Sequence, residues 1–333
     1  MHDIDPRGPS AREHRWDQRS VVTLRAVFVL TLILAPVAAV TLRGAADGMD
    51  DLLPGDEVVV ADILGSQLPL HVNERVERWV ERFRTDQRPD FQRLLARQGL
   101  YAEMIRQKLR DRGMPSELLY MAMMESGLSA RAVSVASAVG VWQFMGPTAE
   151  EYGLRVDDFV DERRDPVRAT DAALDYLQYL YERYDSWYLT AAAYNAGPGR
   201  VDRILRRHAG GRTGDEDLYW QVLEHLPRET REYVPRLVAA TLLAENADAQ
   251  GFVVDLHQPY RYERVFVPGG TSLSRVARGL DVEARLLRDL NPHLIRGVTP
   301  PDETYPVRVP VGDSPRLLAS MGRTGRSIRR ADD

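Results

Sequence analysis

The middle of the chain repeats apolar residues every three or four positions, from about residue 72 to residue 246. This spacing is typical of amphipathic helices that bury one face. No alternating pattern of strands interrupts the region, so we expect residues 71–251 to form an all-α domain. The predicted helices begin near Asn73, span residues 90–111, follow Pro115, Pro166 and Pro198, and end with one over about residues 227–246.

The pattern changes after Tyr260. Residues 261–267 alternate between polar and apolar as a strand does, two short amphipathic helices follow, and residues 305–309 alternate again. This β-α-α-β order predicts a small α+β module over residues 260–312. We expect residues 313–333 to form a disordered basic tail.

The N-terminal segment carries an uncharged run between Arg25 and Arg43, with arginines before it. The run is short for a membrane span, which needs about 20 residues, but long enough for the apolar part of a signal peptide. A buried core helix is the alternative, but the terminal position favours export. We interpret residues 1–43 as a cytoplasmic n-region with a cleaved signal peptide or an uncleaved membrane anchor, and residues 44–70 as a linker rich in Gly and Pro.

Composition narrows the classes of function. The 333 residues are 44% hydrophobic and 28% charged, as in ordinary globular proteins, with room for about two domains. The net charge of −5 predicts no broad basic face for nucleic acid. There is no cysteine, which excludes disulfides, thiolate metal sites, a cysteine nucleophile and a lipid-modified N-terminal cysteine.

Glu125 is the first candidate for chemistry. It ends an otherwise apolar predicted helix and is followed directly by Ser126 and Gly127. Burial among Leu and Met side chains disfavours the charged form and raises the pKa of a carboxyl group, and the negative end of the helix dipole acts in the same direction. A carboxylic acid that stays protonated near neutral pH can act as a general acid. Taken alone, such a Glu is more often a solvated surface charge.

Amides and aromatic residues elsewhere strengthen the hypothesis. Gln143 lies between Trp142 and Phe144, while Tyr194 and Asn195 end an Ala-rich helix. Amides hydrogen-bond the acetamido groups of N-acetyl sugars, and aromatic faces stack on sugar rings. We expect Trp142 itself to be a core residue.

Four short motifs follow one another along the helical region: ESG at residues 125–127, GVWQFM at 140–145, AYNAGPGRV at 193–201 and ETREYVP at 229–235. Through these motifs the chain resembles, over roughly residues 68–251, the lytic murein transglycosylases that have a goose-lysozyme-like domain. The resemblance is closest to the membrane-bound lytic murein transglycosylase D branch, through DERRDP at residues 161–166 and the form of the last motif.

The C-terminal module, through residues 267–292, resembles a LysM module that binds N-acetylglucosamine chains. The insertion at residues 295–304 departs from a compact module, and a packing appendage is the alternative.

The resemblance implies a lysozyme-like fold and a single catalytic carboxyl group, with no cofactor or metal. Glu125 would protonate the bond between N-acetylmuramic acid and N-acetylglucosamine in peptidoglycan, and then deprotonate the 6-hydroxyl that closes a 1,6-anhydro ring. A periplasmic location, and contact with the inner membrane if the N-terminal segment is uncleaved, follow from the same resemblance and the apolar run. The residues implied in substrate binding are Ser126, Gln143, Met145, Tyr194, Asn195 and Tyr233.

Two other functions stay open at this stage. A goose-type hydrolase would add water with the help of a second carboxylate, for which Asp157, Asp158 and Glu162 are candidates. A non-catalytic scaffold would only bind the cell wall, although an intact Glu125 argues against it. Structural alternatives also stand for single residues, since Ser126 could cap its helix and Tyr233 could anchor the last one.

Overall fold

The computed structural model describes residues 58–59, 66–322 and 329–330. The export segment expected within residues 1–43 lies outside these residues. Within the described ranges, no helix has both the length and the apolar character that crossing a membrane requires.

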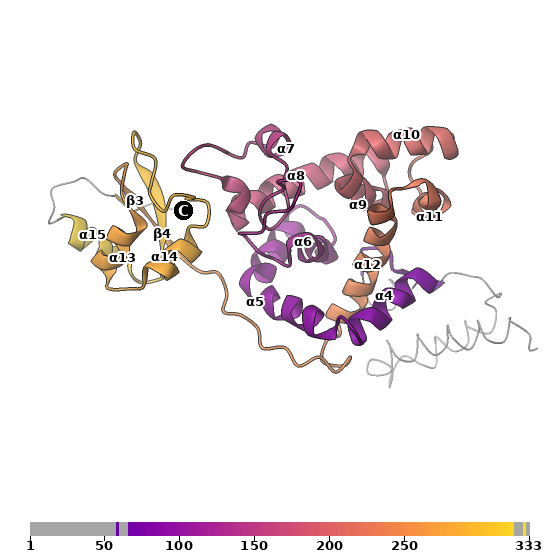
Figure 1. Ribbon diagram of the computed structural model, residues 1–333, viewed down its shortest axis with the longest axis horizontal. Helices are drawn as coiled ribbons and strands as arrows, with labels where there is room; N and C mark the ends of the chain where they lie inside the picture. Colours follow the sequence, from indigo (N-terminus) through magenta and orange to yellow (C-terminus); the bar gives the residue numbers. More distant parts are fainter. Residues whose placement is uncertain (1–57, 60–65, 323–328, 331–333) are drawn as a thin grey trace, which may run out of the picture. The chain divides into compact units, whose positions relative to one another are not determined.

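The first part of the described chain is helical, which confirms the predicted all-α domain (Figure 1). Two short strands, β1 (Val58–Val59) and β2 (His71–Val72), precede it. Three 3-10 turns interrupt the series: η1 (Ser116–Leu118), η2 (Glu162–Arg164) and η3 (Leu223–His225). The helices are α4 (Glu74–Arg84), α5 (Arg88–Asp111), α6 (Leu119–Ser126), α7 (Gly146–Glu151), α8 (Pro166–Tyr184), α9 (Trp187–Ala196), α10 (Pro198–His208), α11 (Asp217–Gln221) and α12 (Arg228–Ala244).

Helix α6 is buried along most of its length. Every residue of its first five, from Leu119 to Met123, is buried, and the helix packs against α5 and α12. It ends at Gly127, which has a left-handed φ of 62° and donates its N–H to the carbonyl of Met123. A Cβ at Gly127 would lie 2.8 Å from Leu94 Cδ2, so a side chain fits poorly there. The sequence thus stops α6 one turn after its buried stretch, with Glu125 in the last turn.

The end of the expected linker belongs to the helical domain, which corrects the boundary at residue 70. Leu68 and Leu70 are fully buried, and the hydroxyl of Tyr188 in α9 donates to the carbonyl of Pro69 (2.7 Å). The reason is that two leucines alternate across a short extended segment, so both side chains reach the core.

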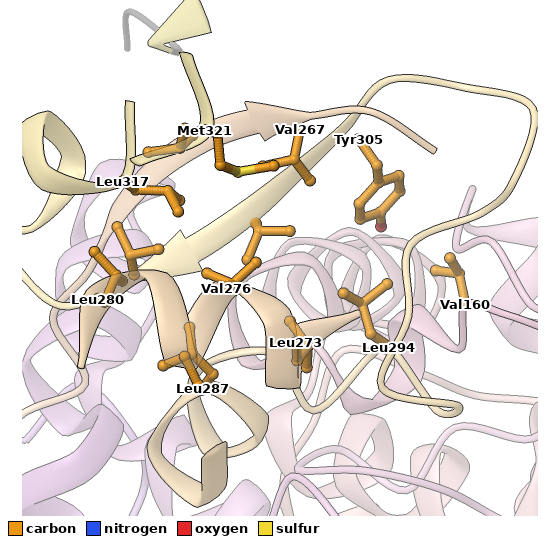
Figure 2. Packing of buried hydrophobic residues seen from close by; sticks show 14 residues of the cluster. Val160, Val267, Leu273, Val276, Leu280, Leu287, Leu294, Tyr305, Leu317 and Met321 are labelled. Atoms are coloured by element: carbon orange, nitrogen blue, oxygen red, sulfur yellow. The ribbon is translucent and has the colours of Figure 1, made fainter. Parts of the chain in front are cut away.

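The C-terminal module has the predicted α+β order. Strands β3 (Glu263–Val267) and β4 (Tyr305–Val309) pair antiparallel with Val265 opposite Val307, and β5 (Arg329–Arg330) pairs with the other edge of β3. Between β3 and β4 come α13 (Leu273–Leu280) and α14 (Ala284–Leu290), whose apolar faces cover the sheet (Figure 2).

The prediction of a disordered tail from residue 313 is wrong for its first part. Residues Ser314–Gly322 form helix α15, and Leu317 and Met321 lie in the core of the module with Val276 and Leu280 (Figure 2). Two apolar residues four positions apart on a helix share a face, so this segment can close the module. The many arginines further on hid that spacing.

The module and the helical domain share buried contacts. Val160, from the loop before η2, lies in the module's own apolar cluster (Figure 2). The backbone N–H of Asp161 donates to the carbonyl of His293, and that of Ile295 donates to Phe159. Arg308 on β4 reaches Asp165 at the start of α8, with 2.6 Å between Nη2 and Oδ2. The module is therefore docked on the loop over residues 155–165.

Candidate active site

Glu125 lies where the sequence predicted it, in the last turn of α6, half-buried among apolar neighbours. The hydroxyl of Tyr233 on α12 donates to Glu125 Oε1 over 2.7 Å. Burial raises the pKa of Glu125 from its ordinary value of 4.5 to about 7, while the hydrogen bond from Tyr233 and the charge of Arg236 act in the opposite direction without cancelling it. Glu125 can therefore be protonated or ionised near neutral pH.

Helix α12 supplies the electrostatic surroundings of this carboxyl group. Arg236 donates through Nη2 to the carbonyl of Met124 (3.0 Å), so it binds the backbone beside Glu125. Among the described residues, no cation forms an ion pair with Glu125 itself. In the part of the chain that the structure describes, Glu229 is the acid whose charge raises the pKa of Glu125. Because Arg236 binds the neighbouring backbone and not the carboxylate, its charge lowers the pKa of Glu125 without keeping the carboxyl group ionised.

Ser126 and Tyr194 hold the turn that follows Gly140. Ser126 Oγ donates to the carbonyl of Val141 (2.7 Å), and the Tyr194 hydroxyl donates to the carbonyl of Trp142 (2.8 Å). These two bonds join the turn to the end of α6 and to α9. Ser126 therefore acts on the backbone and not as a simple helix cap.

The same turn is fixed from its other side. Gly140 has a φ of +85°, and a Cβ there would lie 1.7 Å from the carbonyl oxygen of Arg163. Gln143 also has a positive φ, 52°, and its Nε2 donates to the carbonyl of Gly140 (2.9 Å). A residue other than glycine held in this region signals a constrained backbone. Gln143 keeps its side-chain oxygen without a hydrogen bond inside the described part of the chain.

Asn195 and Met145 border the site in different ways. Asn195 Oδ1 accepts a hydrogen bond from Thr230 Oγ1 (2.8 Å), which ties α9 to α12 and leaves the amide nitrogen as a donor. Met145 is 44% exposed, so part of its apolar side chain faces solvent. Trp142 is fully buried and donates to Thr170 Oγ1, as expected for a core residue.

Separate hydrogen bonds thus link α6, α9, α12 and the turn, the four elements that carry the predicted residues Glu125, Ser126, Gln143, Tyr194, Asn195 and Tyr233. Three further residues near Glu125 or Asn195 were not predicted, namely Arg236, Thr230 and Glu229. Their signal was present, since Glu229, Tyr233 and Arg236 are four and three positions apart and so share one face of α12.

The carboxylates considered as a second catalytic group have other contacts. Asp157 accepts from the N–H groups of Phe159 and Val160, and these bonds and Arg155 lower its pKa although burial opposes them. Glu162 accepts from the N–H of Arg155. Asp158 pairs with Arg296 of the module at 3.4 Å. All three belong to the loop that docks the module. In the described part of the chain, no group of three acidic or histidine side chains is arranged to hold a metal ion.

Comparison with known proteins matches two parts of the chain to known domain families. Residues 103–214 match the family model of the transglycosylase SLT domain, and residues 261–320 match that of the LysM-like domain of lytic transglycosylase MltD. The chain therefore contains a transglycosylase domain of the SLT type. The domain after it is a LysM-like domain of the MltD type.

Two relatives from Escherichia coli match parts of the chain. The membrane-bound lytic murein transglycosylase D of Escherichia coli K12 is 33% identical over 194 residues, which cover 57% of this chain and 42% of that protein. The soluble lytic murein transglycosylase of the same organism is 31% identical over 130 residues, covering 37% of this chain and 19% of that protein. The chain spans less than half the length of either relative.

A solved structure, the 70 kDa soluble lytic transglycosylase of Escherichia coli, aligns with a TM-score of 0.37 at 24% identity, covering 47% of this chain and 26% of that one.

Proposed function

We propose that this chain is a peptidoglycan lytic transglycosylase. It cleaves the β-1,4 bond between N-acetylmuramic acid and N-acetylglucosamine without water and leaves 1,6-anhydro ends. One observation carries the proposal: Glu125, whose pKa is raised to about 7 by burial, forms no ion pair among the described residues and is hydrogen-bonded to Tyr233. Such a group can both give and take a proton at neutral pH.

In the first step, protonated Glu125 gives its proton to the glycosidic oxygen, and the bond from that oxygen to C1 of N-acetylmuramic acid breaks. The sugar's own 2-acetamido oxygen stabilises the cationic carbon, which removes the need for a second enzyme carboxylate. In the second step, ionised Glu125 takes the proton of the 6-hydroxyl while the oxygen of that hydroxyl forms a bond to C1. Proton and electrons balance, and Glu125 returns to its starting form.

The other site residues bind and orient in this scheme. Tyr233 donates to the ionised carboxylate of Glu125 between the steps, and Tyr194 lies beside the same acid. Gln143 and Asn195 keep an amide oxygen and an amide nitrogen available for acetamido groups of the glycan. Ser126 positions the turn that carries Gln143. Met145 offers an exposed apolar surface to a sugar ring.

A water-adding hydrolase is the second candidate. The observation that favours it is that a second carboxylate, Glu229, lies close enough for its charge to raise the pKa of Glu125. Mass spectrometry of sacculi digested by the purified chain separates the two. The transglycosylase yields fragments lighter than the hydrolysed fragments by one water, and the Glu125→Gln variant yields none. Fragments that carry only reducing ends would replace the proposal with a hydrolase, and no release at all would leave a binding protein.

We further infer that the chain acts in the periplasm, held at the inner membrane where its apolar N-terminal run is not cleaved. The arginines before that run and the membrane-bound character of the Escherichia coli relative support this location. A reporter active only in the periplasm, fused after Gly251, is expected to be active. A silent reporter with the protein recovered from the cytoplasm would contradict export.

A further inference from the structure

A cavity of about 430 Å³ lies where the module meets the helical domain. Four arginines line it, two from each side of the boundary. Arg131 follows α6 and Arg164 ends η2, while Arg288 lies on α14 and Arg296 in the loop after it. Only the docked chain brings the four together, which sets this cavity apart from the site around Glu125.

The charges in and around the cavity do not cancel. Asp161 is the one acid in the lining, and Arg163 already binds it through two hydrogen bonds of 2.9 Å. At the rim, Asp289 pairs with Arg131 (3.1 Å) and Asp158 pairs with Arg296 (3.4 Å). Five arginines therefore face three aspartates, in a chain whose net charge is −5. A local excess of this kind attracts anions.

Two of the guanidinium groups have free donors. Arg288 has no hydrogen bond or ion pair from its side chain within the described ranges, although its backbone carbonyl accepts from Arg131 (2.7 Å). Arg164 Nε is buried without a hydrogen bond, and Asp161 Oδ2 lies 3.5 Å from it. The planar fork of an arginine matches a carboxylate with two parallel hydrogen bonds.

The lining limits the size and kind of ligand. Leu273 and Leu294 belong to the module's core and form an apolar part of the wall. The side-chain amide of Asn291 is already hydrogen-bonded to the backbone of Leu287 and Arg308. The cavity lies near the lower end of the range of volumes typical of small-molecule sites. It suits a short acidic branch and not a length of glycan strand.

We propose that this cavity binds a carboxylate of the acidic peptide branches that peptidoglycan carries on its glycan strands. The proposal rests on the function proposed above for its choice of substrate. It gives the module a role in substrate recognition that neither sugar binding nor packing supplies. The concave lining and the contribution of both domains favour a small carboxylate over a flat anionic membrane surface.

Binding is tested with the Glu125→Gln chain, so that the polymer stays intact, by sedimentation with insoluble sacculi. Arg288→Ala is expected to weaken binding by roughly five- to tenfold, the effect of losing one partly exposed charge-assisted hydrogen bond. Arg278→Ala is the matched control, because Arg278 is exposed on α13 of the same module and lies outside the cavity. It is expected to bind as the parent does.

Two further arms identify the ligand. A carbodiimide and an amine convert the carboxylates of sacculi to amides. The parent should bind these amidated sacculi as weakly as Arg288→Ala binds intact sacculi. The affinity of Arg288→Ala should be the same on both kinds of sacculi. Equal binding of intact sacculi by both arginine variants would overturn the proposal. So would an Arg288→Ala substitution that weakens binding to amidated sacculi as much as it weakens binding to intact ones. So would binding to phosphatidylglycerol vesicles that depends on Arg288 while sacculus binding does not. Because the assay needs no turnover, a chain that releases no anhydro fragments would refute the proposed reaction and leave this result readable.

Discussion

Two carboxyl groups in this chain are both shielded from water, but their pKa values are shifted in opposite directions. Burial raises the pKa of Glu125 to about 7. Burial also acts to raise the pKa of Asp165, but the charges of Arg308 and His293 and the hydrogen bonds to the carboxylate outweigh it, and the pKa is lowered. Glu125 lies at the C-terminal end of α6, whereas Asp165 caps the N-terminus of α8 and accepts from the N–H groups of Val167 and Arg168.

These two groups show what decides whether a buried acid is charged. Burial is common to both groups, so it does not distinguish them. The two groups differ in whether a cation contacts the carboxylate and in which end of a helix the carboxylate lies at. The acid proposed for catalysis is left with one neutral donor, Tyr233, and the acid that docks the module is paired with Arg308.

The largest expected effect comes from removing the exchangeable proton. Glu125→Gln keeps the shape of the side chain and a group that Tyr233 can hydrogen-bond, but it cannot protonate the glycosidic oxygen. We expect turnover on sacculi to fall at least ~10²–10⁴-fold, the range typical of acid–base catalysis. An unchanged circular dichroism spectrum is the control for folding. Near-normal release of anhydro fragments would remove Glu125 from the mechanism.

Breaking the other member of the comparison should affect stability. Arg308→Met leaves Asp165 buried without its cation, and loss of one partner of a buried pair costs about 3–5 kcal/mol. We expect the free energy of unfolding, measured by urea denaturation, to fall by that order.

Adding Asp165→Asn to Arg308→Met should recover part of the loss. Asn still caps a helix, and it leaves no buried charge. If the single variant is as stable as the parent, the ion pair is not what docks the module.

The pH dependence should differ in sign between the two groups. Because the folded pKa of Glu125 lies above its unfolded value of 4.5, it contributes stability below pH 4.5 that is lost as the pH rises toward 7. Asp165 is the reverse, since its lowered pKa contributes stability above its unfolded value of 3.8 that is lost in acid. His293, whose pKa burial lowers to about 4, is also destabilising in acid.

Two measurements follow from these signs. The difference in unfolding free energy between the parent and Glu125→Gln should change between pH 4.5 and 7 and be flat elsewhere. The kcat/KM of the parent should fall above pH about 7, by roughly tenfold per unit, as the acid form is lost. A rate that rises through this range would contradict the role of Glu125 as acid.

The smallest effect is expected at Tyr233. Its hydrogen bond lowers the pKa of Glu125 against the larger effect of burial, so Tyr233→Phe should raise that pKa further. The alkaline limb of kcat/KM should move to higher pH, while kcat falls by about tenfold because the ionised carboxylate loses a donor. Tyr219→Phe, on a buried hydroxyl bound to the backbone of α12, is the control, and its alkaline limb should not move. An unmoved limb in Tyr233→Phe would make this residue a packing residue.

Much of the fold followed from sequence because its signals are local. The apolar spacing of α8, the Pro residues at the starts of α8 and α10, and the alternation of β3 each specify an element from a few neighbouring residues. Glu125 and Tyr233 followed from motifs whose residues the structure joins by one hydrogen bond.

The rest depends on contacts between distant parts of the chain. Arg308 and Asp165 are 143 positions apart, and nothing in either neighbourhood indicates the other. The cavity between the domains and the burial of Leu68 likewise arise only after the helices have packed. Helix α15 had a local signal in Leu317 and Met321, which the arginines around it concealed.

The place of Val160 has a consequence for the order of synthesis. Its side chain belongs to a core whose strands and helices begin roughly 100 residues later in the chain, and domains generally fold in the order in which they emerge. The helical domain can therefore assemble around α6 while Val160 still faces water. During that interval the loop before α8 is a natural site for a chaperone or a protease, and the arrival of α13, β4 and α15 ends the exposure.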